Sequence, residues 1–339
     1  MEDKLSDIYD GLVSENNDIM KKLIKEVPES MKNSKYAKTP TNKVTRMTGI
    51  IVAIVVLIAL KKLMNIGNSD NVSPMLPFII MLIFMFFIFP LTIVGILVIG
   101  KKSKNSRLYE EKIVMPLIKN LEFVKECAID KGIPPQIYSA AKFRDSNYND
   151  YKKSNYIMGY IDKTKIEFSK IITKYEYTVT DSDGNMTTKI KTLFDGLVIV
   201  ATLDKNIING YIHIFSDKNK DEKEDKMKVN MDSMEFEQNF DVYATEPVRA
   251  LEILTSDIMQ MLIDEKEKNG YKYEISMTQN MIIMRIFNTE QIFKVRFKEN
   301  TSSITCKDDL KDNILQDAIF VQNIAIFINN IANDIYDKG

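Results

Sequence analysis

Histidine and cysteine are almost absent from this sequence, which has one histidine, His213, and two cysteines, Cys127 and Cys306. The cysteines are far apart and have no CxxC spacing, a pattern that favours a reducing compartment over a disulfide-stapled exterior. A zinc site or a Cys/His nucleophile pair would have to draw nearly all of these side chains from distant places. We therefore predict neither a metal site nor thiol-based catalysis.

An excess of one charge is also missing, because 46 Lys and Arg residues stand against 47 Asp and Glu residues, for a formal net charge of -1. No global basic field exists to hold nucleic acid, so we expect no nucleic-acid partner. The phosphate-binding patterns GxGxxG and GxxxxGK followed by Ser or Thr do not occur. The sequence predicts no cofactor and singles out no catalytic, cofactor-binding or metal-binding residue.

A long uncharged run is what the sequence does have. No residue from 75 to 100 is charged, and this run exceeds the about 20 apolar residues that span a bilayer. Residues 47–60 are apolar too, and Lys61 and Lys62 can extend toward the headgroups if the helix continues to residue 66. We predict a two-helix transmembrane hairpin at residues 47–100, with spans at 47–66 and 75–100. The alternative for the shorter run is a buried core helix.

Lysine and arginine in the short flanks orient this hairpin. The flank before it contains Lys32, Lys35, Lys38, Lys43 and Arg46, and the flank after it contains Lys101, Lys102, Lys104 and Arg107. The intervening loop offers only Lys61 and Lys62, so the positive-inside rule places both termini in the cytoplasm of a multi-pass protein of the inner (plasma) membrane. No Asp, Glu, His or Arg lies inside either span, which favours an anchor in the lipid bilayer over a transporter.

The segments before the hairpin differ in character. Residues 1–30 place apolar side chains near helical spacing, interrupted around Gly11 and at Asn16 and Asn17, which predicts an N-terminal amphipathic helical segment. Its polar side is acidic and would be repelled by an anionic inner leaflet, so we expect it to pack against protein. Residues 31–46 are basic and interrupted by proline, as expected of a tether.

Residues 101–339 are expected to form one cytoplasmic domain of the α+β class, an antiparallel sheet with flanking helices. Apolar residues recur at intervals of three and four residues, the spacing of one helix face, over residues 108–128, 246–268 and 308–336. This pattern predicts helices there. Strands are predicted where apolar and polar residues alternate or where β-branched residues follow one another. These segments are 166–168, 175–179, 194–203, 210–215, 271–277, 281–287 and 291–297, with a turn at 181–185. The C-terminal helix at 308–336 either packs on its own domain or serves self-association as a homo-oligomer.

Two clusters of acidic side chains are considered as candidate binding or catalytic sites. Residues 181–185, DSDGN, superficially resemble a calcium loop, but Met186 and Thr192 occupy the positions of the required glycine and glutamate, so a hairpin turn is favoured. A second cluster contains the carboxylates Asp232, Glu235, Glu237 and Asp241. Because Phe236, Phe240 and Val242 are expected to point inward, these acids should mostly face solvent. His213, among apolar neighbours, is interpreted as an ordinary strand residue.

Several segments of the domain resemble a known family. They are the run from Met158 to Thr164, FDGLVIVATLDK from Phe194, FEQNFDVYAT from Phe236 and ILTSDIM from Ile253. Their order resembles the bacterial "domain of unknown function three-one-three-seven" family, most clearly over residues 156–287, and the double span before the domain fits such proteins. The resemblance implies a bacterial inner-membrane protein, in some cases found beside LemA-type membrane proteins. It brings no catalytic residues.

The inert hairpin and the missing catalytic sets favour a non-enzymatic interaction or scaffolding module with a protein partner. Two alternatives remain. One is a hydrolase that uses the carboxylates near Phe236, and the other is a small-molecule sensor with an apolar cavity in the sheet.

Overall fold

The structure is a computed structural model. It describes residues 1–31, 104–143, 147–180, 186–216, 227–289, 291–295 and 306–338. The hairpin predicted at 47–100, most of the tether and the turn at 181–185 therefore lie outside the described residues. The chain divides into two compact units, one with Met1–Glu15, Glu110–Arg296 and Lys311–Gly339, and the other with Asn16–Tyr109 and Phe297–Leu310.

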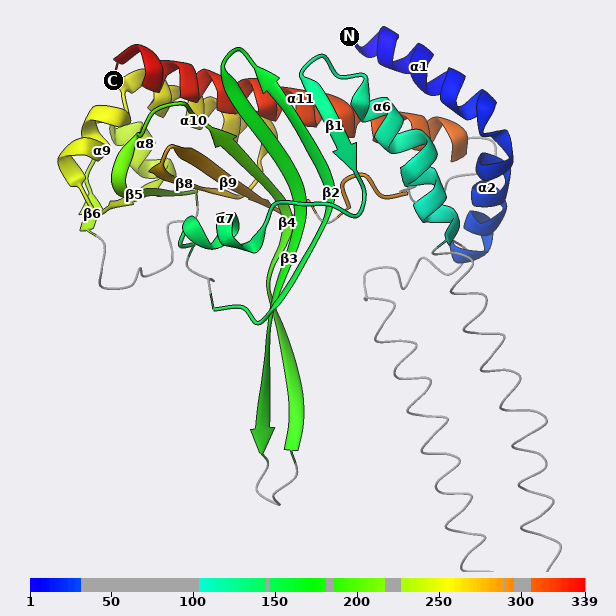
Figure 1. Ribbon diagram of the computed structural model, residues 1–339, viewed down its shortest axis with the longest axis horizontal. Coiled ribbons are helices and arrows are strands. Elements are labelled where there is room, and N and C mark those ends of the chain that lie inside the picture. The colour runs from blue at the N-terminus through cyan, green and yellow to red at the C-terminus, as the bar shows by residue number, and fades with distance from the viewer. Residues whose placement is uncertain are drawn as a thin grey trace, which may run out of the picture. The chain divides into compact units, whose positions relative to one another are not determined.

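The first unit is built on one antiparallel sheet (Figure 1). Its nine strands are β1 (Val124–Ala128), β2 (Asp150–Ile161), β3 (Thr164–Thr180), β4 (Met186–Thr202), β5 (Ile208–Phe215), β6 (Met227–Val229), β7 (Asp241–Ala244), β8 (Tyr273–Gln279) and β9 (Met281–Phe287). They lie in the order β1-β2-β3-β4-β9-β8-β5-β7-β6, and every pair is antiparallel. The α+β class and the antiparallel sheet are confirmed.

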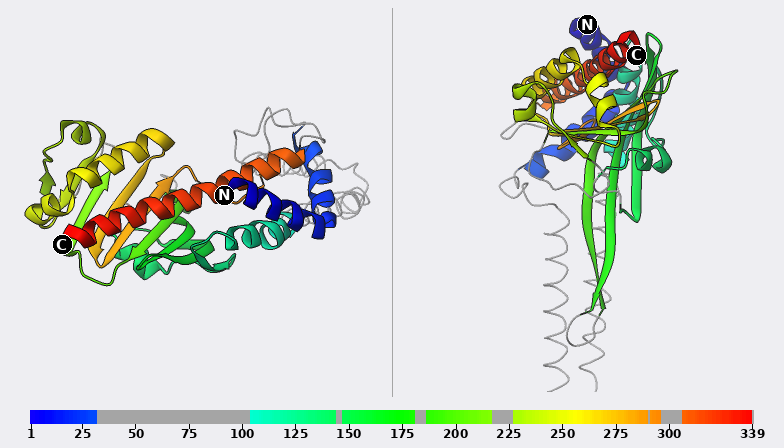
Figure 2. Two further views of the ribbon diagram at one scale, coloured as in Figure 1. Left: turned by 90° about the horizontal axis from the view of Figure 1, so that it is seen from above. Right: turned by 90° about the vertical axis from the view of Figure 1, so that its left-hand side faces the viewer.

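Helices cover both faces of this sheet. α10 (Ser256–Asn269) and α11 (Cys306–Lys338) lie along one face, and the short α7 (Pro135–Ala140) lies on the other (Figure 2). From Lys311 onward α11 buries one apolar stripe: Ile314, Leu315, Ala318, Val321, Ile324, Ala325, Phe327, Ile328, Ile331, Ala332 and Ile335. The C-terminal helix therefore packs on its own domain, the first of the two alternatives weighed for it.

The helix predicted at 108–128 ends early. It continues as η3 (Glu110–Val114) and α6 (Met115–Lys119), and residues 124–128 form strand β1 instead. Asn120 stops the helix: its backbone N–H donates back into the last turn and its side-chain amide donates to the Pro116 carbonyl at 2.8 Å. The following residues then pair with β2, a long-range contact that the local apolar spacing does not reveal.

The single helix predicted at 246–268 is two helices, α9 (Pro247–Ile253) and α10. The break falls at Leu254 and Thr255. The Thr255 hydroxyl accepts the N–H of Ile258 at 3.3 Å as an N-cap and donates to the Asp334 carboxylate at 2.7 Å. α10 then ends at Gly270, which adopts the left-handed conformation that is common for glycine after the last turn of a helix.

The prediction of a strand at 291–297 is wrong for residues 291–295, the part that the structure describes, because these residues form a turn. Phe293 has a φ of 62°, and its N–H donates to the buried Asp317 carboxylate of α11 at 2.8 Å. A positive φ at this residue is incompatible with a continuing strand.

The N-terminal segment forms two helices, α1 (Glu2–Glu15) and α2 (Asn17–Met31), with the predicted break at Asn16 but none at Gly11. α1 contacts η3 and α6 and buries Leu5 and Tyr9. The expectation that this segment packs against protein is thus met by α1.

Candidate docking surface

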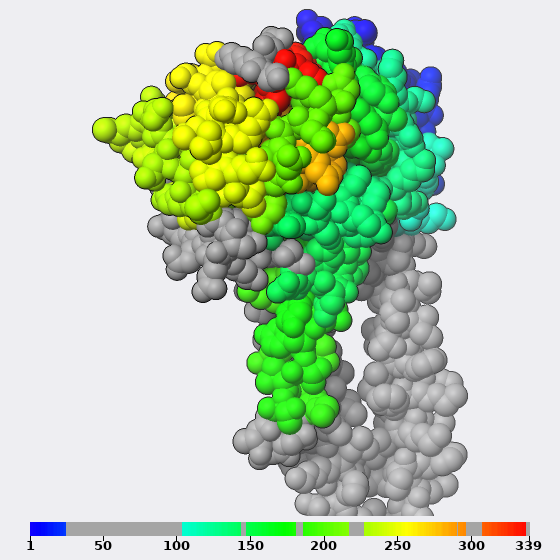
Figure 3. Space-filling model, turned by 60° about the vertical axis from the view of Figure 1, so that its left-hand side comes forward, coloured from blue at the N-terminus to red at the C-terminus, as the bar shows by residue number. Residues whose placement is uncertain are grey.

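Strands β3 and β4 continue far beyond the rest of the sheet. The last partner of β3 on the β2 side is Asp150, opposite Lys174, and β4 leaves β9 at Gly196. Beyond this point residues 175–180 pair only with residues 186–191, and together with the pair of Lys174 and Thr192 at the base they form a two-stranded ribbon, residues 174–180 and 186–192. We call this ribbon the arm. At about 3.4 Å per residue it is about 20 Å long, and it projects from the domain in Figure 3.

The arm exposes large apolar side chains on both faces. Tyr175 and Tyr177 are 42% and 39% exposed, and their rings stack with centroids 5.8 Å apart. On the opposite face Met186 and Ile190 are 78% and 54% exposed. A two-stranded hairpin alone is only marginally stable in water, so exposed rings and aliphatic chains on it are typical of a surface that another molecule covers.

Positive charge lies beside the rings. Lys191 is directly opposite Tyr175, and Lys189 is directly opposite Tyr177, so the four side chains share one face of the arm. Both lysines are exposed, and neither has an ion-pair partner within the described part of the chain. This face therefore combines two rings with two uncompensated charges.

The edges of the arm are protected against strand addition. Asn149 caps the β3 edge: its side-chain amide donates to the Glu176 carbonyl, and its side-chain oxygen accepts the Glu176 N–H, both at 2.8 Å. The β4 edge carries Lys189 and Lys191, and lysine on an edge strand discourages pairing. The faces of the arm, rather than its edges, are thus the surfaces that a partner would contact.

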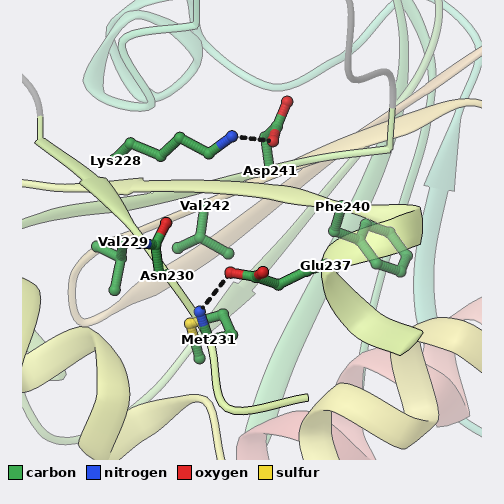
Figure 4. A pocket seen from close by; sticks show the side chains of 8 residues that line it. All are labelled: Lys228, Val229, Asn230, Met231, Glu237, Phe240, Asp241 and Val242. Atoms are coloured by element: carbon green, nitrogen blue, oxygen red, sulfur yellow. Dashed lines mark hydrogen bonds and ion pairs between the residues drawn. The ribbon is translucent and has the colours of Figure 1, made fainter. Parts of the chain in front are cut away.

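The four carboxylates near Phe236 do not converge on one site. Asp232 and Glu235 are exposed, as expected, and Phe236, Phe240 and Val242 are buried. The other two acids line a hollow of about 110 Å³ (Figure 4). There Glu237 accepts the Met231 N–H at 2.8 Å, and Asp241, which is buried, pairs with Lys228 at 2.8 Å and thereby raises the pKa of this lysine. Each lining carboxylate is already occupied by its partner.

His213 lies in β5 as expected and is fully buried. The rings of Tyr211, Phe215 and Phe143 surround it at 5.1, 5.8 and 6.2 Å. A histidine so enclosed has no access to a substrate in solvent. Among the residues that the structure describes, no group of three or more His, Cys, Asp or Glu is placed to hold a metal ion.

The C-terminal end of α11 is tied to two loops around a hollow of about 530 Å³. Lys205 donates to the carbonyls of Ile335 and Tyr336 at 3.1 Å each, where a cation complements the helix end. Asp162 accepts amide hydrogens from Asn329 at 2.8 Å and Asn333 at 3.2 Å, which lower its pKa. Polar side chains of α11 therefore form hydrogen bonds with the domain's own loops.

The Cys127 thiol is half-buried in β1, and burial raises its pKa to about 11. We expect alkylation of Cys127 to be slow at pH 7, where about one thiol in ten thousand is ionised, and to accelerate about ten-fold per pH unit up to pH 10. Iodoacetamide labelling of the Cys306→Ser variant followed by mass spectrometry measures this rate. The same labelling in urea is the control and should lose most of the protection. Fast labelling of the folded protein at pH 7 would contradict the expectation.

The comparison with known families supports the resemblance stated from the sequence. Residues 192–326 match DUF3137, a family described as "Protein of unknown function". The match begins at the arm's last residue in β4 and extends into α11. The DUF3137 region thus includes β4 from residue 192, β5 to β9 and the helices α8 (Met234–Asn239), α9 and α10, together with the carboxylate cluster and His213. Most of the arm precedes it.

No curated protein matches the chain. A solved structure that matches is "crystal structure of the mycobacterial trehalose monomycolate transport factor A, TtfA", at 10% identity over 59% of this chain and 86% of that chain, with a TM-score of 0.31. A likeness at this score does not bear on fold or function.

One helix among the described residues, Lys307–Tyr336 within α11, is long and apolar enough to cross a membrane by length and composition alone. Most of its apolar window is buried, as in a core helix of a soluble domain. The predicted spans at 47–66 and 75–100 are not among the described residues.

The arm is the feature that sequence reasoning missed. The alternation of Tyr175, Tyr177 and Val179 predicts a strand correctly, but alternation does not show whether another element covers the strand. No local pattern separates this ribbon from a covered one, because its exposure follows from where β2 and β9 stop pairing with β3 and β4.

Proposed function

We propose that this protein is a membrane-anchored, non-enzymatic interaction module that docks a protein partner through the arm. The observation that carries the proposal is the arm itself, with exposed Tyr175 and Tyr177 on one face and exposed Met186 and Ile190 on the other. Aromatic side chains dominate the binding energy of many interfaces, because they bury a large area at low entropic cost.

The anchor is proposed from the sequence. Two apolar runs, 47–66 and 75–100, form the hairpin, and the basic flanks keep both termini and the domain in the cytoplasm of a bacterium. In this arrangement residues 1–30 are helical, 31–46 are the tether and 101–339 are the cytoplasmic domain. A LemA-type membrane protein is the candidate partner that the family resemblance suggests, and the balanced net charge argues against nucleic acid.

The hydrolase alternative loses its motive, because two of its four carboxylates face solvent and the other two are occupied by Lys228 and the Met231 N–H. The homo-oligomer through the C-terminal helix loses its motive as well, because the apolar stripe of α11 from Lys311 onward is buried against its own domain.

The proposal predicts that Tyr175→Ser/Tyr177→Ser loses the partner without unfolding. Crosslinking of the intact, tagged protein in its native membrane, followed by affinity capture, should yield a partner with the wild type and not with this variant. Because both rings are exposed, the free energy of unfolding should change by less than about 0.5 kcal/mol per site.

The matched control is Val248→Ser/Leu251→Ser, which removes two exposed apolar side chains from α9. It should retain the partner. Equal capture by all three proteins would overturn the arm as the docking element, and recovery of the protein in the soluble fraction would overturn the anchor.

A further inference from the structure

The face of the arm that carries the two tyrosines has a complement elsewhere in the same chain. Lys189 and Lys191, opposite the stacked rings, require anionic partners if the rings are to be buried. The chain offers an exposed acidic surface on α1, whose inner side is fixed by the buried Leu5 and Tyr9. Asp3, Asp7 and Asp10 lie on the opposite side of this helix, since they are spaced by four and three residues.

The charges on α1 are only partly compensated. Lys311 pairs with Asp10 at 2.6 Å, whereas Asp3 and Asp7 are exposed and have no ion-pair partner within the described part of the chain. Like charges four residues apart on a helix repel each other. A cationic surface placed on Asp3 and Asp7 would remove this repulsion.

The spacings of the two charge pairs agree. Four residues along a helix separate Asp3 and Asp7 by about 6 Å. Two residues along a strand separate Lys189 and Lys191 by about 6.6 Å. A strand face laid along the outer side of α1 can therefore form both ion pairs at once, with the rings of Tyr175 and Tyr177 covering the adjoining helix surface.

The two surfaces of one chain do not meet. α1 packs on η3 and α6, and the arm extends away from the sheet, apart from α1 in Figure 1 and in the right-hand view of Figure 2. The complementary surfaces must therefore belong to different copies. If each arm reaches the other copy's α1, the contact occurs twice and closes with two-fold symmetry.

A lipid surface fits the arm less well. Lys174, Lys189 and Lys191 are balanced by Glu176 and by Asp181 and Asp183 of the connecting turn. The arm alone has a net charge of +2, and the two aspartates of its turn bring the ribbon with its turn to zero. Such a ribbon gains little from an anionic leaflet, whereas a partner surface with two carboxylates can use the two lysines on one face.

We propose that the partner of the arm is a second copy of this chain, with the face of Tyr175, Tyr177, Lys189 and Lys191 docked on the outer side of α1. This inference rests on the proposed docking role of the arm and names its occupant. The tyrosines supply the buried area, and the lysine–aspartate pairs set the register.

The test is reciprocal charge reversal in the full-length protein in nanodiscs, with mass photometry over a concentration series. The wild type should be a dimer. Lys189→Glu/Lys191→Glu and Asp3→Lys/Asp7→Lys should each weaken dimerisation by about ten-fold or more, and the combination of all four should restore it to within about three-fold. The control Lys125→Glu/Lys163→Glu makes the same charge change at two exposed lysines elsewhere and should leave the dimer intact.

A monomeric wild type, a dimer insensitive to both reversals, or a combined variant that stays monomeric overturns this inference. If the Tyr175→Ser/Tyr177→Ser variant then still loses a different captured protein, the docking role of the arm stands and only its occupant is wrong. A monomer whose arm is protected from proteolysis in anionic but not in zwitterionic nanodiscs identifies a lipid surface and also overturns the inference.

Discussion

Replacement of Arg285 by methionine is expected to lower the free energy of unfolding by about 3–5 kcal/mol, because it leaves the Glu274 carboxylate buried without a cation. Arg285 in β9 is fully buried, and Glu274, directly opposite in β8, is 2% exposed. The guanidinium Nε donates to the Glu274 carboxylate at 2.6 Å, and Nη1 donates to the Tyr138 hydroxyl at 3.1 Å.

The surroundings of this ion pair explain its sensitivity. The rings of Phe143, Phe287 and Phe194 lie 4.4, 5.1 and 5.4 Å from the guanidinium carbon. Burial alone would lower the pKa of Arg285, but Glu274 and Tyr138 outweigh it and raise the pKa above its ordinary value. The pair therefore stays charged in an apolar setting, where a lone carboxylate has no substitute for water.

The measurement is urea unfolding followed by circular dichroism, since the chain has no tryptophan to report by fluorescence. Arg285→Met combined with Glu274→Leu should recover most of the loss, because an apolar pair of similar volume needs no charge compensation. The control Arg249→Met breaks the more exposed pair with Glu252, and should cost less than about 1 kcal/mol. A loss of similar size in the control, or none in Arg285→Met, would refute the account.

The long periodic elements could be predicted from the sequence, and the tertiary partners of single residues could not. The stripe of α11 and the alternation in β8 and β9 depend on spacing alone, so their positions were found to within a few residues. The division between α9 and α10 depends instead on the Thr255 hydroxyl reaching Asp334, far along the chain. The turn at Phe293 similarly depends on Asp317.

The buried ion pair and the arm show that sequence patterns are limited in the same way. The pattern of β9 does not reveal that Arg285 points to the α7 side of the sheet, because its partner there, the Tyr138 hydroxyl, is far away in the sequence. The alternating tyrosines of β3 predict a shared face, but the register with β2 and β9 decides that nothing in the described part of the domain covers it. The exposure of these tyrosines thus depends on how the strands of the whole sheet pair, and the sequence of one strand does not reveal it.

Gly196→Ala is the second substitution with a large expected effect, a loss of about 1–3 kcal/mol or more through overpacking. Gly196 stands in β4 where it leaves β9, and a Cβ there would collide with the backbone carbonyl of Ile286 and come within 2.9 Å of the Phe194 ring. The carbonyl belongs to a paired strand and cannot withdraw without breaking the ladder. This close approach explains the glycine of the FDGLVIV segment, by which the chain resembles DUF3137.

The matched control for this prediction is Gly11→Ala. Gly11 lies inside α1, and a Cβ there meets nothing within 4 Å, so alanine should raise helix stability by up to about 1 kcal/mol. Thermal unfolding of both variants measures the two effects: the melting temperature should fall for Gly196→Ala and rise or stay constant for Gly11→Ala. A fall of the same size in both would mean that added side-chain volume in general, rather than the contact with the Ile286 carbonyl, destabilises the protein.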